Sequence, residues 1–297
     1  MIHYSQCPVC KSSSIQTVFS AKDNTVSKEL FAVWHCNECS ARFTQDVPKQ
    51  ETIGTYYASE NYISHSDTQK GVINKLYHVV RKKTLAGKMN MIKKETGKEF
   101  GNILDVGCGT GAFLHTMQQA GWEIAGLEPD EAARTKARSL YNIEALPSDK
   151  ILDLPANSYD AITLWHVLEH VHQLHEYVAQ LKKLLTENGR LFIAVPNYTS
   201  YDAKTYKENW AAYDVPRHLY HFSPQSMKML MNLHGLQVTK IKPMWFDSFY
   251  VSMLSEQYKN GKGNIIAAFF TGLVSNIKTI FDKEKCSSII YIISKSR

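Results

Sequence analysis

The 297-residue sequence has no uninterrupted hydrophobic run long enough to cross a membrane. Its most apolar late stretch, Ile265 to Phe281, is broken by four polar residues, Thr271, Ser275, Asn276 and Lys278, which are costly in a hydrocarbon core. The first residues, MIHYSQ, lack the basic start and apolar stretch of a secretory signal. We therefore expect no transmembrane helix and no export, and hence a cytoplasmic location.

Acidic residues are missing from residues 68–94, although the formal net charge of the whole chain is only +6. The basic residues of this segment are Lys70, Lys75, Arg81, Lys82, Lys83, Lys88, Lys93 and Lys94. Such a face can attract an anion, for example nucleic acid or a membrane surface, or it can simply be a solvated helix face. Residues 49–100 are accordingly predicted to form a connector followed by a basic amphipathic helix.

Cysteines are few, and four of the six lie in two Cys-x-x-Cys pairs, Cys7 with Cys10 and Cys36 with Cys39. Four thiolates on tight turns are what a closed tetrahedral zinc site needs. Redox pairs and disulfides are the alternatives, but a redox Cys-x-x-Cys normally opens a helix after a strand, and the sequence does not provide that context twice. The sequence therefore predicts structural zinc in a zinc-ribbon-like module, residues 1–48.

Residues 101–297 alternate between segments typical of strands and of helices. Strands are predicted at 102–106, 123–127, 143–146, 161–165, 190–195, 236–242 and 288–294, and helices at 112–120, 130–140, 174–185 and 224–234. This order predicts an α/β fold with a doubly wound, Rossmann-like sheet of seven strands. A helical insertion is predicted at about 249–286, either to cover the active-site mouth or to mediate association. Core packing is the simpler alternative for Ile265, Ile266, Phe269 and Phe270.

A glycine-rich turn, in NILDVGCGTG at 102–111, follows the first predicted strand. Such a turn lets the backbone approach a ligand closely and aims helix N–H groups at it. Gly107, Gly109 and Ala112 fit a relaxed dinucleotide fingerprint, and Glu128 lies about twenty residues on, as a ribose-binding acid should. The loop alone therefore leaves the identity of the cofactor open.

Residues around the glycine loop narrow the choice of cofactor. Asp105 precedes the loop, Gly111 supplies a third glycine, and LEPD ends the second strand at 127–130. With SYDAITLWHVLEHV at 158–171 and LLTENGRL at 184–191, these residues resemble the class I S-adenosylmethionine-dependent methyltransferases, whose signature is an acid, any residue, then Gly-x-Gly-x-Gly. The resemblance, over about residues 101–195, implies an enzyme that transfers a methyl group from S-adenosylmethionine.

The resemblance also implies roles in cofactor binding. Glu128 would bind the ribose, Asp105 would lie near the methionine end, and Asp149 would accept a hydrogen bond from the adenine amino group. Asp153 competes with Asp149 for this last role. The backbone wall would be formed by Gly107, Gly109 and Gly111.

Histidines cluster at 164–170 and 215–221. Because a sulfonium methyl is already a strong electrophile, the protein mainly needs to align the acceptor and, for a hydroxyl, to remove its proton. His218 is predicted as the general base, with a loop-pinning role as the alternative. His166 is predicted as a second catalytic residue because it follows the strand end where ligands bind in such sheets.

The aromatic loop around WAAYDVPRH, at 210–218, is predicted to form the acceptor pocket. Arg217 either grips an anionic substrate group or pairs with Asp214. The predicted substrate-binding residues are Trp210, Tyr213, Arg217 and His221.

The acceptor is the least defined element. The N-terminal module and aromatic loop resemble those of sugar methyltransferases and of bacterial methyltransferases of glycan or secondary-metabolite assembly, which implies a small polar acceptor. A zinc-ribbon RNA methyltransferase is the alternative, favoured by the basic segment but opposed by LWHV at 164–167, where base-modifying enzymes often carry Asn-Pro-Pro-Tyr. A non-enzymatic adaptor is opposed by the intact loop and Glu128. The oligomeric state stays open.

Overall fold

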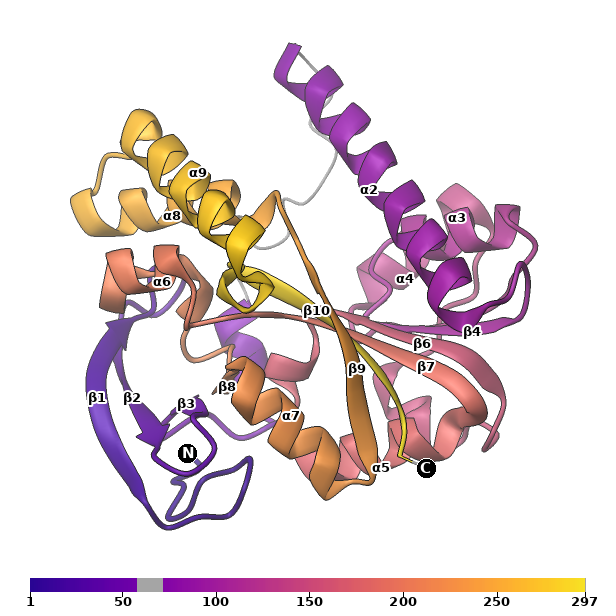
Figure 1. Ribbon diagram of the computed structural model, residues 1–297, viewed down its shortest axis with the longest axis horizontal. Coiled ribbons are helices and arrows are strands. Elements are labelled where there is room, and N and C mark those ends of the chain that lie inside the picture. The colour runs from indigo at the N-terminus through magenta and orange to yellow at the C-terminus, as the bar shows by residue number, and fades with distance from the viewer. Residues whose placement is uncertain (58–71, 297) are drawn as a thin grey trace.

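The computed structural model describes residues 1–57 and 72–296, with side chains described from residue 82 onward in the second range (Figure 1). Lys70 and the side chains of Lys75 and Arg81, part of the predicted basic face, lie outside the described residues. The strands form two sheets, ordered β1-β2-β3-β8 and β5-β4-β6-β7-β10-β9. The smaller sheet belongs to the N-terminal part, and the larger one is the centre of the remaining chain.

The six-stranded sheet has four parallel strands at its β5 side. The strand β10 is antiparallel to both its neighbours, so the sheet is mixed. Its strands, in spatial order, are β5 (Glu123–Leu127), β4 (Asn102–Val106), β6 (Tyr159–Trp165), β7 (Leu185–Pro196), β10 (Ser288–Lys295) and β9 (Leu236–Pro243). The nearly continuous apolar sequence of β10 is fully buried up to Ile293, as expected for a strand covered on both faces.

The expected seventh strand at 143–146 is wrong. This segment makes only an isolated bridge between Leu146 and Leu127 of β5. Pro147 follows at once and leads into the 3-10 helix η2 (Ser148–Leu152), so the chain turns away before a ladder can form.

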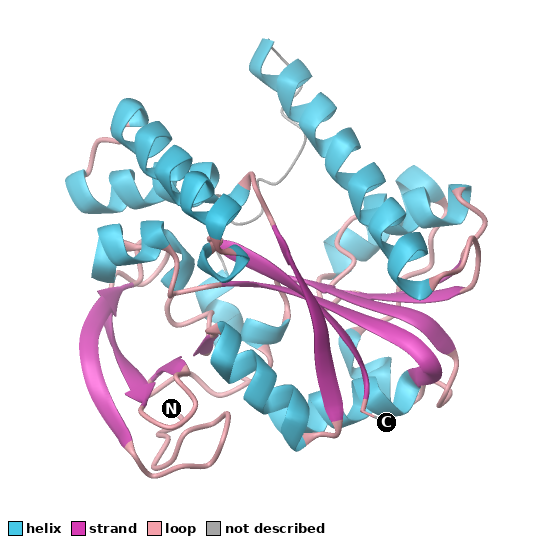
Figure 2. Cartoon of the chain, in the orientation of Figure 1, coloured by secondary structure: helices cyan, strands magenta, loops and turns pink. Residues whose placement is uncertain are grey.

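Helices cover both faces of the six-stranded sheet (Figure 2). One face carries α2 (Val72–Thr96), α3 (Ala112–Gln119) and α4 (Glu131–Tyr141), and the other carries α5 (Leu174–Leu184) and α7 (Pro224–Leu233). Asp130 caps α4 by accepting from the Ala133 backbone N–H, and Ser223 caps α7 in a capping box with Ser226. The sheet is therefore doubly wound, as predicted.

The N-terminal part pairs directly with the loop that follows β7. Its strands are β1 (Ile15–Lys22), β2 (Leu30–Cys36) and β3 (Arg42–Thr44), and β8 (Tyr220–His221) completes the sheet. Antiparallel pairing of β3 with β8 joins residues that lie far apart in the sequence. Short helices fill the connections: η1 (Ile53–Tyr57), η3 (Leu168–His170), α6 (Tyr201–Tyr206), η4 (Lys207–Asn209), η5 (Ala211–Tyr213) and η6 (Lys283–Lys285).

A helical hairpin of α8 (Asp247–Asn260) and α9 (Ile265–Phe281) lies between β9 and β10. The expectation that its large apolar side chains fill a core is wrong. In α9, Ile265, Ile266, Phe269 and Phe270 are 74%, 71%, 53% and 59% exposed. No helix in the described part of the chain combines the length and apolar character needed to cross a bilayer.

Candidate functional site

The glycine loop joins β4 to α3 at the edge of the sheet where the parallel strands end. Gly107, Gly109 and Gly111 have φ angles of 72°, 54° and 78°, a left-handed conformation that glycine adopts without penalty. The backbone N–H groups of Gly107 and Cys108 both donate to the carbonyl of Leu127, which holds the loop against the end of β5. The loop is therefore a fixed bend of bare backbone, as the sequence predicts.

Gly107 lies under the segment that follows β6. A β-carbon at this position would be 2.5 Å from Cγ2 of Val167. We expect Gly107→Ala to lower the free energy of unfolding by about 1–3 kcal/mol, because the φ strain and the contact both act. Gly97→Ala is the matched control, since Gly97 has a φ of 69° but nothing within 4 Å of the new methyl.

Chemical denaturation of both variants separates the contact from the backbone strain. Gly107→Ala together with Val167→Ala should recover part of the loss by removing the contact. Equal destabilisation by Gly107→Ala and Gly97→Ala would show that Val167 does not press on the loop.

Glu128 ends β5 and reaches across the loop. One carboxylate oxygen accepts from the Gly109 backbone N–H at 2.8 Å, and the other accepts from the Asp130 N–H at 3.0 Å. Burial raises the pKa of this carboxyl, while the two backbone donors lower it. Each oxygen keeps a further lone pair, so the carboxylate can accept from both hydroxyls of a ribose.

Asp105 is buried beneath the loop, where the Thr163 hydroxyl donates to it at 2.5 Å. Burial raises the pKa of the Asp105 carboxyl, and the charge of Lys88 opposes this rise. Lys88, from α2, places its ammonium 3.8 Å from the centre of the Trp165 ring. The sequence assigned Lys88 only to a basic face, because helical periodicity does not tell which lysine turns inward.

Asp149 lies in η2, and its side chain is exposed. The bridge between Leu127 and Leu146 brings the start of this segment beside the end of β5. The competing Asp153 pairs with the Lys150 ammonium at 3.0 Å. The role of Asp149 in adenine binding stays a prediction.

His166 lies directly after β6 in a left-handed conformation, with a φ of 59°. Its ring nitrogens face two carboxylates: Nδ1 is 3.3 Å from Glu169 and Nε2 is 3.1 Å from Asp247. Burial lowers its pKa, but the two carboxylates outweigh burial and raise it to about 10. The two carboxylates therefore favour the protonated ring and oppose a role for His166 as a proton acceptor.

Asp247 begins α8 and is a site residue that the sequence did not reveal. Hydrogen bonding to His166 lowers the pKa of its carboxyl, against the effect of burial. It lies 81 residues beyond His166 in the chain. No spacing rule connects two such positions, so only the folded structure brings them together.

His218 is buried, with 8% of its surface exposed. Its Nδ1 donates to the Ala212 carbonyl at 2.9 Å, so in the neutral ring Nε2 is the lone-pair nitrogen. The His170 ring lies 4.6 Å away, and burial lowers the pKa of His170 to about 4. One ligand atom from each of Glu169, His170 and His218 lies within 4.8 Å of the others. His218 thus has the tautomer of a base and is also pinned to the loop.

The predicted acceptor residues occupy a different environment from the one expected. Trp210 donates to Asp202 at 2.8 Å, and Tyr213 accepts from Arg42 at 2.6 Å. Both aromatic side chains are buried, so their polar atoms are already used inside the protein. The aromatic loop therefore packs as a core between the N-terminal part and the sheet, and its role in acceptor binding stays a prediction.

Arg217 and His221 are buried in the same core. The Arg217 guanidinium pairs with Asp214 at 2.6 Å and with Asp23 at 3.0 Å, which selects the second of the two roles predicted for it. His221 Nε2 lies 3.1 Å from the Thr44 hydroxyl. The N-terminal part supplies Asp23 and Thr44, and the sequence could not show that these distant residues satisfy the loop.

The two Cys-x-x-Cys pairs meet in one cluster. The Sγ atoms of Cys7 and Cys39 are 3.6 Å apart, and those of Cys10 and Cys36 are 3.5 Å apart. All four sulfurs lie within 4.8 Å of one another and none is in a disulfide. A tetrahedral site with Zn–S bonds of about 2.3 Å requires sulfurs roughly 3.8 Å apart. The cluster therefore fits a zinc ion in geometry and in ligand type.

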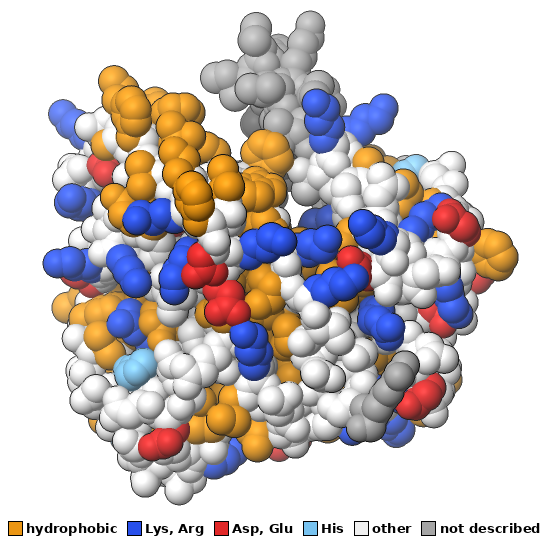
Figure 3. Space-filling model, viewed as in Figure 1, with side chains coloured by type: hydrophobic (Ala, Val, Ile, Leu, Met, Phe, Trp, Pro, Cys, Tyr) orange, Lys and Arg blue, Asp and Glu red, His pale blue; other side chains and the backbone are white. Residues whose placement is uncertain are grey.

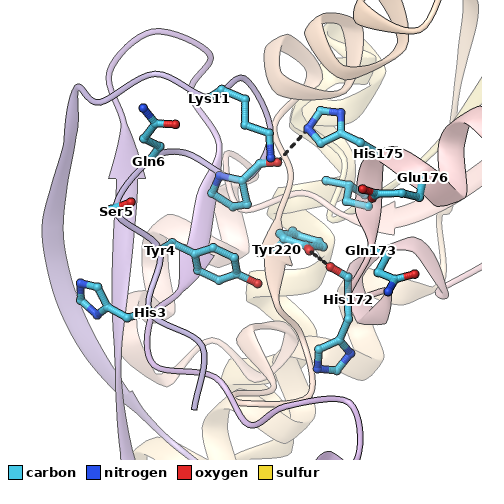
Figure 4. A pocket seen from close by; sticks show the side chains of 12 residues that line it. His3, Tyr4, Ser5, Gln6, Lys11, His172, Gln173, His175, Glu176 and Tyr220 are labelled. Carbon is cyan, nitrogen blue, oxygen red and sulfur yellow. Dashed lines mark hydrogen bonds between the residues drawn. The ribbon is translucent and has the colours of Figure 1, made fainter.

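A separate cavity of about 370 Å³ lies between the first residues and the start of α5 (Figure 4). His175 Nε2 hydrogen-bonds to the Pro8 carbonyl across it, and the Tyr220 hydroxyl donates to the His172 carbonyl. Its lining contains no residue predicted to bind cofactor, acceptor or metal. This cavity therefore lies where the N-terminal part packs against the rest of the chain, apart from the candidate site.

Parts of the chain are similar to known methyltransferases. A family model described as a methyltransferase domain matches residues 79–241. The human mitochondrial ubiquinone biosynthesis O-methyltransferase is 27% identical over 165 residues, 50% of this chain and 44% of that protein. The enzyme of the same name from Photobacterium profundum is 30% identical over 128 residues, 40% of this chain and 53% of that protein. The chain thus spans about half the length of these curated relatives.

A solved structure supports the fold. A putative sarcosine dimethylglycine methyltransferase from Galdieria sulphuraria aligns with 75% of this chain and 88% of its own, with a TM-score of 0.51 and 15% identity. The family match covers more than half of the chain and includes the glycine loop, Glu128, His166 and His218. The chain belongs to the family of methyltransferase domains.

Proposed function

We propose that the protein transfers a methyl group from S-adenosylmethionine to a hydroxyl group of a small molecule. The observation that carries the proposal is the Glu128 carboxylate, which spans the glycine loop with a lone pair free on each oxygen for a ribose. The relatives named as O-methyltransferases of ubiquinone biosynthesis favour a hydroxyl as the acceptor group. Their names offer no support for the sugar or glycan precursor that the sequence suggested.

The glycine loop and three acidic residues would hold the cofactor. Glu128 would bind the ribose, Asp149 the adenine amino group, and the buried Asp105 would lie below the methionine end of the site. S-adenosylmethionine supplies an electrophilic methyl group when it is bound. The protein then has to align the acceptor oxygen with that methyl group. It also has to accept the proton of the acceptor hydroxyl.

The two predicted catalytic histidines divide these tasks. His218, with Nδ1 bound to the Ala212 carbonyl, would accept the proton of the acceptor at Nε2. His166, charged between Glu169 and Asp247, would orient the acceptor oxygen by donating a hydrogen bond to it. A rearrangement of one of its carboxylate contacts would have to free an N–H for this purpose.

We expect His218→Gln to lower kcat about 100-fold, near the lower end of the range for general-base catalysis, because bulk water can replace part of the base. Affinity for S-adenosylmethionine should stay unchanged, since His218 is separate from the glycine loop. The matched control is His234→Gln, whose ring contacts His175 in α5 away from the loop. Single-turnover rates and calorimetry measure the two quantities.

Unchanged kcat in His218→Gln, with the true acceptor, would remove the base assignment and leave the loop-pinning role. A fall in cofactor affinity as large as the fall in kcat would also remove the base assignment, because it would show that the substitution disturbs the whole site.

The proposed activity is tested with methyl-labelled cofactor and pools of small molecules and RNA. Label in a small molecule supports the proposal, and label in RNA supports the zinc-ribbon RNA methyltransferase instead. In the described part of the basic segment, Lys88 faces Trp165 and Lys93 pairs with Glu99, whereas Lys82, Lys83 and Lys94 are exposed. The labelling experiment therefore decides between the two acceptors. Calorimetry showing no affinity for S-adenosylmethionine or its demethylated product would favour the adaptor.

A further inference from the structure

Helix α9 has its polarity reversed for a helix at the surface of a protein. Its buried positions are the small or polar residues Ala268, Gly272, Ser275 and Thr279. Its outward side carries large apolar side chains: Ile265, Ile266, Phe269, Phe270, Ile277, Ile280 and Phe281, all between 45% and 86% exposed. An ordinary amphipathic helix of a globular protein buries residues of this kind. A continuous apolar row of this length on a surface marks an interaction site.

The inward side of α9 explains how the helix can present this face. A β-carbon at Gly272 would be 3.1 Å from the Cα of Phe249, so the backbones of α8 and α9 approach closely there. The Ser275 hydroxyl donates to the buried Asp202 at 2.7 Å. These contacts fix the rotation of α9 and point its apolar residues outward, which makes the exposed row a built feature of the fold.

Cationic side chains flank the end of this row. A cavity of about 440 Å³ beside the last turn of α9 is lined by three lysines, Lys204, Lys278 and Lys285, together with Tyr201 and Phe281. Asp282 is the single acid in its lining, 4.0 Å from Lys285. Figure 3 shows apolar side chains over α9, with basic side chains in blue and some acidic ones in red below them. The cavity thus offers positive charge and a polar ring directly next to Phe281.

Apolar contact and positive charge side by side match a phospholipid with an anionic head group. A helix with an apolar face and flanking lysines binds at the boundary between head groups and acyl chains, lying in the plane of the interface. Lysines near such a surface are attracted to anionic lipids. A second copy of the chain fits less well, because a two-fold contact through α9 would bring the lysines of both copies near one another.

We propose that α9 docks on the surface of a bilayer that contains anionic phospholipid. The apolar row enters the interface, and the cavity of Lys204, Lys278 and Lys285 accepts a phosphate head group. The hairpin also touches the candidate active site, since Asp247 at the start of α8 pairs with His166. Docking would therefore place a catalytic neighbour close to the membrane, where an apolar acceptor could enter.

Flotation of the full-length protein tests the proposal with two kinds of vesicle, phosphatidylcholine alone and phosphatidylcholine mixed with phosphatidylglycerol in equal parts. We expect binding to the mixed vesicles and a much weaker association with the neutral ones. Replacing Ile265, Ile266 and Phe281 with Ser should lower the bound fraction about tenfold or more, because each loses buried apolar area. Phe100→Ser with Leu152→Ser is the control, since these side chains are 72% and 71% exposed elsewhere.

A second variant tests the charges separately. Changing Lys204, Lys278 and Lys285 to Gln should abolish the preference for anionic vesicles, whereas the same change at the exposed Lys11, Lys22 and Lys136 should largely preserve it. Equal losses in both lysine variants would overturn the head-group site. Full binding by the Ser variant would overturn the role of α9.

Light scattering separates membrane docking from self-association. A wild-type dimer that becomes a monomer in the Ser variant would assign the apolar row to a second copy and overturn the proposal. Because the three replaced side chains are highly exposed, the Ser variant should keep the wild-type unfolding temperature. If it does not fold, Phe270→Ser alone repeats the test with one substitution.

Discussion

Replacing Glu128 with Ala is expected to lower the affinity for S-adenosylmethionine by a factor of about 10² to 10⁴. The reason is that a ribose diol would lose two hydrogen bonds to a charged acceptor, worth about 1.5–3 kcal/mol each. The backbone N–H groups of Gly109 and Asp130 also lose their acceptor, which loosens the loop. Isothermal calorimetry with the cofactor and its demethylated product measures the change.

The control for this variant is Glu131→Ala. Glu131 lies three residues after Glu128 and is exposed in the first turn of α4. Its replacement removes one negative charge, as Glu128→Ala does, without changing a contact of the glycine loop. Its affinity for the cofactor should stay close to wild type. Retention of affinity by Glu128→Ala, with the unfolding temperature unchanged, would contradict the ribose role and with it the proposed orientation of the cofactor.

Much of the central fold could be predicted because its signals are local. The strands at 102–106 and 123–127 match β4 and β5 residue for residue, since each is a short apolar run bounded by glycine or polar residues. The loop between β4 and α3 could be predicted for the same reason. Three glycines at alternate positions predict a tight turn of the backbone, and the left-handed φ angles of all three agree with this prediction.

The environment of the aromatic loop could not be predicted, because its partners come from elsewhere in the chain. Trp210 and Tyr213 have the composition of a binding pocket, and the same composition suits a core between two parts of a protein. The Arg42 and Asp23 side chains decide between these, and their pairing with Tyr213 and Arg217 is not visible in any spacing. Burial of a polar aromatic cluster is a property of the assembled fold.

The prediction that the large apolar side chains of α9 are buried was wrong for a different reason. Hydrophobic periodicity identifies a helix face but assumes that the large apolar side is the buried one. In α9 the close approach of Gly272 to Phe249 reverses this relation. The seventh strand failed because of a turn signal: Pro147 and the following η2 end the apolar segment 143–146 before it can pair.

The N-terminal part supports the candidate base as well as its own fold. The Thr44 hydroxyl donates to the His218 carbonyl at 2.7 Å, and Asp23 holds Arg217 next to it in the sequence. Strands β3 and β8 share a ladder beside these contacts. Cys36 ends β2 and Cys39 lies in the turn before β3, so we expect the position of His218 to depend on the cysteine cluster.

We propose that the cysteine cluster holds one zinc ion per chain, and we expect Cys39→Ser with Cys36→Ser to bind nearly none. Structural zinc in small modules contributes about 10 kcal/mol or more of apparent binding free energy, so the sheet of β1, β2 and β3 should become unstable without it. Because Thr44 then no longer holds His218, kcat should fall more than the affinity for S-adenosylmethionine. Metal analysis, thermal unfolding and calorimetry follow the three quantities.

Cys286→Ser is the matched control for the loss of a buried thiol. Cys286 is fully buried beside Met244, between α9 and β10, and takes no part in the cluster. This variant should keep one zinc ion and the wild-type division between kcat and cofactor affinity. A wild-type protein that contains no zinc after purification and takes up none on titration would contradict the metal assignment. Zinc loss that lowers kcat and affinity equally would contradict the link between the cluster and His218, because the damage would then have spread to the glycine loop.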